Sequence, residues 1–161
     1  MSPEDTQTFG KRQEFMAIAT MMAKGYDVYL TLVDNQQIDC IVRHDDEGKL
    51  TYYDVQIKAR SKAAQRKSWA TWPNLKILKP RENFFVVFYS DPIKEYWVVP
   101  SLFLAEHSSR TTTGPYKDHF TVTLAKCPEG SPPEYVATFK PYRGAFHLLG
   151  GSREVLSVAK G

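Results

Sequence analysis

The stretch "YYDVQIKAR" (residues 52–60) has an alternating pattern from which the rest of the fold can be worked out. Its apolar positions are Val55, Ile57 and Ala59, and the polar positions around them are Asp54, Gln56, Lys58 and Arg60. A period of two is typical of a β-strand with one face in the core. The other face carries an acid, an amide and an amine in line, unlike the Thr/Glu/Lys mixture of a solvated edge strand.

Two more strands are predicted ahead of this one, at residues 26–33 ("YDVYLTLV") and 37–43 ("QIDCIVR"). The polar run "HDDEGK" (residues 44–49) has the composition of a turn. The three strands are therefore expected to form an antiparallel meander.

The register of the second hairpin determines which polar side chains meet. With Arg43 opposite Leu50, Asp39 would lie opposite Asp54 and diagonal to Gln56. A slip of one residue would move these side chains to opposite faces. The side chains expected to share one face are Asp39, Asp54, Gln56 and Lys58.

A helix is predicted before the strands. Ser2 followed by Pro3 and two acids is typical of a helix N-terminus, and Gly25 is a natural end. The apolar stripe expected at helical spacing consists of Phe15, Ile18, Ala19 and Met22. Glu14 lies at the border of this stripe, so its carboxylate is expected to point along the sheet, and Gly10 would let the helix approach closely.

Beyond the meander, a second helix is predicted at residues 61–70, and it is expected to end before Pro73. Strands are expected at residues 83–91, 95–100 and 118–126, with a short helix at 101–108 and a loop at 127–134. The order helix, meander, helix, strand indicates an α/β (α+β) fold, with extra strands and helices at the C-terminal end. At 161 residues the chain is expected to form one domain, residues 1–161.

The net charge of +3 is small, but the charges are unevenly distributed. Residues 1–58 contain six Lys/Arg and ten Asp/Glu, whereas residues 59–81 contain seven Lys/Arg and no acid. Trp69 and Trp72 lie within this basic segment. Two interpretations stay open: a solvated face, or a surface that neutralises phosphates and stacks on bases.

Cysteine usage and hydropathy bear on the compartment. Cys40 and Cys127 form no CxxC pair, so a reducing, cytoplasmic setting is expected. No apolar run approaches the roughly 20 residues of a membrane span, and the N-terminus lacks the pattern of a signal peptide. No membrane partner is therefore expected.

The candidate catalytic side chains are Glu14, Asp39, Gln56 and Lys58. Mg²⁺ binds hard oxygens from one or two carboxylates, with water and substrate phosphate completing its shell. Such an ion can activate water and neutralise the charge that builds up on a phosphoryl group. An ammonium beside it can orient the water and offset negative charge. The set predicts metal-dependent hydrolysis of phosphodiester bonds.

This arrangement resembles the PD-(D/E)XK nuclease superfamily, whose motif is an acid on a helix, an Asp on the second strand and Asp/Glu-x-Lys on the third. The stretches "GKRQE" (residues 10–14), "QID" (37–39) and "QIK" (56–58) stand at these places. The resemblance covers roughly residues 10–100 and is closest to a little-characterised prokaryotic branch, related to a compact intron-encoded homing endonuclease. It implies a restriction-endonuclease-like core, with residues 101–161 as a C-terminal elaboration.

The resemblance also implies roles for individual residues. Glu14, Asp39 and Gln56 would hold Mg²⁺, with Mn²⁺ as a substitute. The backbone carbonyl of Ile57 would join them, and Lys58 would position the attacking water. The residues expected to contact nucleic acid, DNA rather than RNA, are Arg60, Lys62, Arg66, Lys67 and Trp69. A nuclease acting on both strands would favour a homodimer or a higher homo-oligomer.

Two positions depart from the motif. Ile38 replaces the Pro, which is harmless, and Gln56 replaces the acid of Asp/Glu-x-Lys. An amide oxygen can bind Mg²⁺ but lacks the charge, so the metal would be held more weakly unless Asp54 supplies that charge. Two alternatives follow: a catalytically inactive nucleic-acid-binding or partner module on the same fold, or a structural domain whose basic segment is merely solvated.

Overall fold

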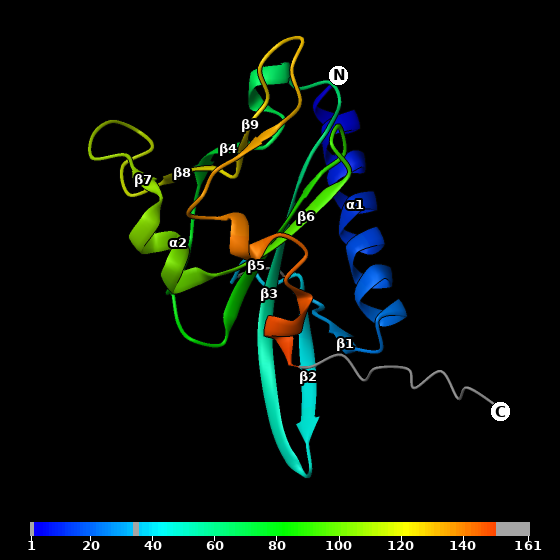
Figure 1. The fold of residues 1–161 in the computed structure, drawn as a ribbon. Helices are drawn as coiled ribbons and strands as arrows, with labels where there is room; N and C mark the ends of the chain where they lie inside the picture. The colour runs from blue at the N-terminus through cyan, green and yellow to red at the C-terminus, as the bar shows by residue number, and fades with distance from the viewer. Residues whose placement is uncertain (1, 34–35, 151–161) are drawn as a thin grey trace, which may run out of the picture.

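The computed structural model describes residues 2–33 and 36–150, and it contains the expected helix, meander and following strands (Figure 1). The helices are α1 (Pro3–Ala23) and α2 (Ser101–His107), with 3-10 turns η1 (Arg66–Ser68), η2 (Lys140–Tyr142) and η3 (Phe146–Leu149). The strands are β1 (Asp27–Leu30), β2 (Cys40–Asp46), β3 (Lys49–Arg60), β4 (Thr71–Leu75), β5 (Phe84–Ser90), β6 (Glu95–Pro100), β7 (Ser109–Arg110), β8 (Phe120–Thr123), β9 (Ala125–Lys126) and β10 (Glu134–Tyr135). The predicted domain also includes residues 151–161, which lie outside the described ranges.

Both ends of α1 have the signals expected from the sequence. The Ser2 hydroxyl accepts a hydrogen bond from the Asp5 backbone N–H, and the Asp5 carboxylate accepts one from the Ser2 backbone N–H, which completes a capping box. At the other end Gly25 has a positive φ of 88°, and the Tyr26 N–H donates to the Met21 carbonyl. This geometry ends the helix and directs the chain into β1.

The buried face of α1 differs from the predicted stripe. Its buried side chains are Ala17, Ile18 and Met21, whereas Phe15 and Met22 are exposed. The helix therefore meets the sheet through positions that lie three, four and seven residues after Glu14, which places Glu14 on the sheet-facing side. A Cβ added at Gly10 would meet nothing within 4 Å, so the prediction that glycine is needed there for close approach is wrong.

The antiparallel meander is confirmed, with a register that differs by two residues from the expected one. Arg43 pairs with Tyr52 rather than Leu50, because the turn contains only Glu47 and Gly48. Both turn residues have a positive φ, which suits a two-residue hairpin turn. An even shift keeps every side chain on its predicted face.

The central sheet has five strands in the order β1-β2-β3-β5-β6. Strands β3 and β5 pair in parallel, and the other pairs are antiparallel. In Figure 1, α1 covers one face, and the smaller sheet of β4, β8 and β7 lies with α2 beyond the other. Each face has its own hydrophobic core, one containing Ala17, Val55 and Val87 and the other Trp72, Val86 and Trp97.

The predicted helix at residues 61–70 is absent. This segment contains turns and the three-residue η1, and then enters β4. Helical propensity here is overridden because Ala70, Trp72 and Leu75 are buried in the core beneath the small sheet. The predicted strand at 118–126 is divided into β8 and β9, which belong to different sheets.

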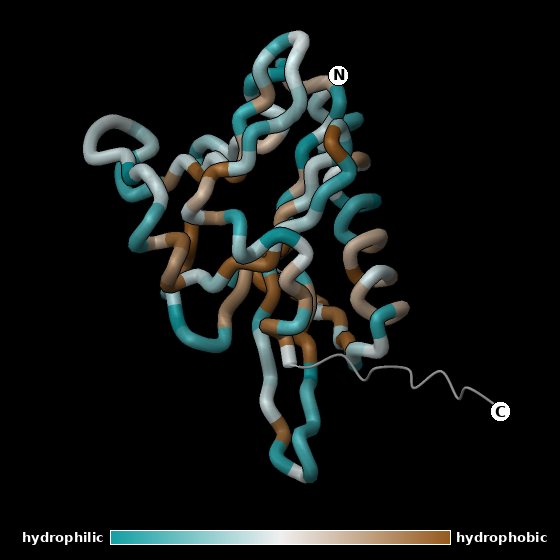
Figure 2. Tube along the Cα trace, in the orientation of Figure 1, coloured by the Kyte–Doolittle hydropathy of each residue, from teal (hydrophilic) through white to brown (hydrophobic). Residues whose placement is uncertain are grey.

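The hairpin of β2 and β3 projects beyond the body of the molecule, and its tip is hydrophilic (Figure 2). Within the described residues, no helix has the length and apolar character needed to cross a bilayer.

Candidate functional site

A cleft of about 910 Å³ lies between the N-terminal half of α1 and the C-terminal end of β3. Residues of α1 line one wall, and the end of β3 with the segment after it lines the other. Among the residues predicted to carry chemistry, Glu14, Asp39, Ile57 and Lys58 line this cleft. The structure thus brings together side chains that are separated by up to 44 positions in the sequence, from Glu14 to Lys58.

Asp39 joins the site to the sheet. It lies directly before β2, and its Oδ2 accepts a hydrogen bond of 2.6 Å from the Ile57 backbone N–H. The Asp39 N–H donates in turn to the Val55 carbonyl at 2.8 Å. The carboxylate therefore takes the place of a backbone acceptor at the end of the β2–β3 ladder, which fixes its position beside β3.

Glu14 approaches from α1. Only 15% of its side chain is exposed, although the helix is on the surface. Lys11, three positions earlier on the same helix face, places its Nζ 2.9 Å from Oε1 and 2.8 Å from Oε2 of Glu14. Lys11 was not predicted as a site residue; its spacing from Glu14 is the signal that could have indicated it.

Ile57 and Lys58 come from the end of β3. The Ile57 side chain is buried beneath α1, and its backbone N–H points toward Asp39. In a strand the N–H and C=O of one residue point the same way, so the Ile57 carbonyl is directed to the same side. Lys58 is partly buried and lines the cleft.

Gln56 is buried and does not line the cleft. The residue is only 2% exposed, and its side-chain Oε1 has no hydrogen-bond partner among the described residues. A buried polar atom without a partner is costly and calls for an explanation. An oxygen of this kind is a suitable ligand for a hard cation.

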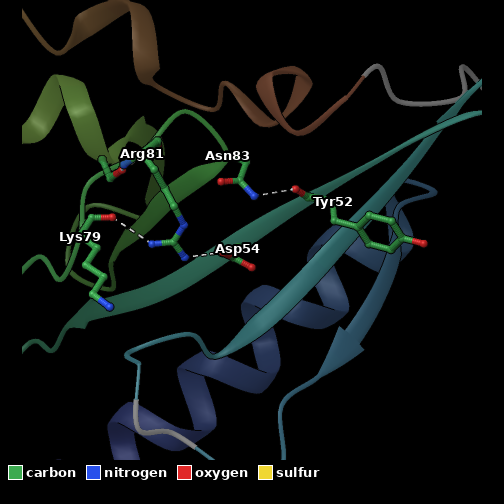
Figure 3. A network of polar contacts seen from close by, with 6 residues as sticks. Tyr52, Asp54, Lys79, Arg81 and Asn83 are labelled. Carbon is green, nitrogen blue, oxygen red and sulfur yellow. Dashed lines mark hydrogen bonds and ion pairs between the residues drawn. The ribbon is translucent and has the colours of Figure 1, made fainter.

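Asp54 is engaged elsewhere. Its carboxylate forms an ion pair with Arg81, and Figure 3 shows Arg81 reaching Asp54 while it also donates to the Lys79 carbonyl. Asp54 does not line the cleft. The expectation that Asp54 could supply the charge missing at Gln56 is therefore wrong. Asp54 lies two residues before Gln56 on β3, and Arg81 neutralises its carboxylate.

Three of the five residues predicted to contact nucleic acid have protein hydrogen-bond partners, and two of these, Arg66 and Trp69, do not line the cleft. Arg66 donates to the carbonyls of Pro128 and Ser131, at 2.9 Å each, and stacks on the Trp69 ring. Trp69 donates from Nε1 to the Ala64 carbonyl and packs against the core. Both side chains tie the basic segment to the rest of the fold.

The other three basic residues lie closer to solvent or to the cleft. Arg60 lines the cleft and donates to the Ser68 carbonyl, and burial lowers the pKa of its guanidinium. Lys62 and Lys67 are exposed. We call Lys58, Arg60, Lys62 and Lys67 the cationic margin: Lys58 and Arg60 line the cleft, and Lys62 and Lys67 are exposed on the segment that follows β3.

Cys40 is a buried thiol close to the carboxylates of Asp39 and Glu14. Its thiol has a pKa raised to about 12, chiefly by burial, with smaller contributions from the negative charges of Asp39 and Glu14. A thiol in this environment stays protonated at neutral pH and acts as a core side chain.

The donor set fits a hard divalent cation. Two carboxylates (Glu14 and Asp39) and Ile57 line the cleft, and the Gln56 amide oxygen, which lacks a protein partner, is buried next to Ile57 on β3. Across residues 2–33 and 36–150, no three His, Cys, Asp or Glu side chains gather as a metal cluster. Mg²⁺ needs no more than one or two carboxylates, because water and phosphate complete its shell.

No family model and no curated protein matches the chain. Among solved structures, the chain is similar to the bacterial homing endonuclease I-Ssp6803I, with a TM-score of 0.56 and 21% sequence identity. The match covers 89% of this chain and 92% of that one. The fold is restriction-endonuclease-like. At this identity the likeness confirms the predicted α+β fold, with its N-terminal helix and mixed five-stranded sheet.

Proposed function

We propose that the protein is a Mg²⁺-dependent nuclease that hydrolyses phosphodiester bonds of DNA. The observation that supports this most directly is the cleft in which Glu14, Asp39 and Lys58 come together from three separate elements. They occur in the order of the PD-(D/E)XK motif, on a fold similar to that of a homing endonuclease. The proposal assigns the chain to the branch of that superfamily in which Gln replaces the motif acid.

In this proposal, oxygens of Glu14, Asp39, Gln56 and Ile57 hold the metal ion. The bound ion would supply charge neutralisation at the phosphate and a more acidic water. Lys58 orients the attacking water and offsets negative charge that develops on the phosphoryl oxygens. The hydrogen bond from the Ile57 N–H keeps Asp39 in place beside the ion.

Substrate binding is assigned to the cationic margin of the cleft. Arg60, Lys62 and Lys67 would contact backbone phosphates, which position the substrate without reading its sequence. Arg66 and Trp69 already donate hydrogen bonds to the loop at 128–131 and to Ala64. Their predicted contacts with nucleic acid would be made in addition to these hydrogen bonds or in place of them. For cleavage of both strands, two copies related by a two-fold axis would each supply one cleft.

A second candidate function is an inactive nucleic-acid-binding module on the same fold. Gln56 favours it, because an amide leaves the site with one charge fewer than three carboxylates would give. This alternative keeps the cationic margin and requires no divalent ion.

A cleavage assay separates the two candidates. Supercoiled plasmid, single-stranded DNA and structured RNA are incubated with Mg²⁺, Mn²⁺ or EDTA, using wild type, Lys58→Ala and the matched variant Lys49→Ala. Lys49 lies on the same strand at the exposed hairpin tip. The proposal expects metal-dependent cutting of DNA that Lys58→Ala lowers by about 100-fold or more and Lys49→Ala leaves unchanged.

Other results contradict the proposal. Equal cutting by wild type and Lys58→Ala would place the activity in a contaminant. Salt-sensitive DNA binding without cutting, in the presence of either metal, would support the inactive module. Preferential cutting of RNA would keep the chemistry and change the substrate.

A further inference from the structure

Lys11 lies on the carboxylate that the proposed metal ion needs. Its Nζ is within 2.9 Å of both oxygens of Glu14, so the ammonium holds the same atoms that a cation would bind. We infer that Lys11 is a displaceable counter-ion of the metal site, which competes with a divalent cation for Glu14. This inference rests on the proposed function, because it concerns the same site.

The two partners of this ion pair differ in their freedom to move. The Glu14 side chain is 15% exposed and faces the sheet, whereas the Lys11 side chain is 63% exposed. Water can solvate the Lys11 ammonium when it leaves Glu14, because that side chain is mostly exposed. The carboxylate stays in position, and a divalent cation can take the place of the ammonium.

The local charges explain why displacement is needed. Glu14 and Asp39 bring two negative charges to the cleft, and Lys11, Lys58 and Arg60 bring three positive ones. A divalent cation that enters this set is repelled by all three cationic side chains. Once Lys11 leaves Glu14, the cation gains the full attraction of the carboxylate, and Gln56 contributes an oxygen without further charge.

A displaced Lys11 stays near the substrate side of the site. Its side chain lines the cleft that Lys58 also lines, and a second hollow that contains Glu14, Asp39 and Thr31. The released ammonium is then available to a phosphate at the mouth of the cleft. Lys11 thereby acts as a positioning residue, which sets the concentration of metal at which the site fills.

The test measures Mn²⁺ binding directly, by the electron paramagnetic resonance signal of free Mn²⁺ at increasing protein concentration. Lys11→Met is expected to lower the dissociation constant by about fivefold, because a competing ion pair is lost. Lys11→Arg keeps the charge and is expected to stay near the wild-type value. Met is a good helix former at an exposed site, and thermal unfolding of each variant verifies the fold.

Arg12→Met is the matched control. Arg12 is the neighbouring cation on α1, but it lines a different hollow and stacks on Phe9. It is expected to leave Mn²⁺ affinity within about twofold, since its charge does not contact Glu14. Equal gains from Lys11→Met and Arg12→Met would overturn the inference in favour of a general effect of net charge.

Three further outcomes are decisive. Weaker Mn²⁺ binding by Lys11→Met would overturn the inference, because Lys11 would then support Glu14 rather than compete for it. Glu14→Gln reports on the proposed function by itself: if it binds Mn²⁺ as well as wild type, the metal does not use Glu14. If neither wild type nor Lys11→Met takes up Mn²⁺, the proposed metal site fails and the inference fails with it.

Discussion

The two ends of β3 belong to one continuous strand and have very different surroundings. At the C-terminal end, Val55, Gln56 and Ile57 are buried, with β2 and β5 on either side and α1 above. At the N-terminal end, Lys49 and Leu50 are exposed in the projecting hairpin (Figure 1). Alternation shows that a segment is a strand; the neighbouring elements determine where along that strand polar side chains can form a site.

The two ends also differ in charge. The hairpin tip carries Asp45, Asp46 and Glu47, whereas the other end runs from Lys58 into the basic segment. Opposite charges at the two ends favour approach of a polyanion to the cleft and disfavour its approach to the tip.

The two aspartates that bracket β2 give the largest expected contrast. Asp39 accepts the Ile57 N–H at the cleft, and Asp45 accepts the Gly48 N–H at 2.8 Å in the turn. Asp39→Asn is expected to lower cleavage by at least about 100-fold, because it removes a charged metal ligand while keeping an acceptor oxygen. Asp45→Asn serves as the control in the same assay, and a comparable loss there would remove the distinction between the two ends.

Apolar side chains at the two ends are expected to differ in their contribution to stability. Ile57→Ala should lower the free energy of unfolding by about 2–5 kcal/mol, since it leaves a cavity beneath α1. Leu50 is 47% exposed, so Leu50→Ala should cost less than about 1 kcal/mol. Urea denaturation measures both, and similar losses would show that the hairpin is packed in solution.

Cys40 predicts a pH dependence at the cleft end. Burial raises the pKa of the Cys40 thiol in the folded protein to about 12, so the stability that the thiol contributes is present below its ordinary pKa and is lost as pH rises toward 12. Between pH 9 and 10.5 the loss should be roughly 1–2 kcal/mol.

Buried tyrosines add losses in the same direction, because burial also raises the pKa of Tyr26 and Tyr89. The informative quantity is therefore the difference between wild type and Cys40→Ala, measured by denaturation at each pH. Parallel curves for the two proteins would mean that the Cys40 thiol is accessible to water.

The cationic margin gives the smallest expected effect. Lys62→Ala combined with Lys67→Ala should reduce the slope of log affinity for DNA against log salt by about 2, since each phosphate contact contributes roughly 0.9. Lys49→Ala should leave that slope unchanged. Fluorescence anisotropy with a labelled duplex measures it, and an unchanged slope in the double variant would place DNA on another face.

The sequence predicted the central elements because their signals were local. The alternation in β3, the Ser2 cap of α1 and a turn within residues 44–49 each depend on a few neighbouring residues. The helix predicted at residues 61–70 is absent because the burial of Trp72 and Leu75 in the core determines the path of this segment. Helix propensity is a local property and contains no information on such tertiary contacts.

The candidate site was predictable to a lesser extent. Glu14, Asp39 and Lys58 were identified from their spacing and from a family resemblance, and the cleft brings them together. The partners of Asp54 and Arg66 could not be foreseen, because Arg81 and the carbonyls of Pro128 and Ser131 are distant in sequence. Lys11 was overlooked, since an i, i+3 pair on an exposed helix is common.

The hydrogen bond between Asp39 and the Ile57 N–H has a consequence for the history of this chain. A descendant that lost nuclease activity would still be selected to keep an acceptor at position 39, because the end of the β2–β3 ladder depends on it. Glu14 and Lys58 would be free to drift once no metal or phosphate needed them. Retention of Asp39 among relatives would therefore record the demands of folding, and retention of Glu14 and Lys58 would record those of catalysis.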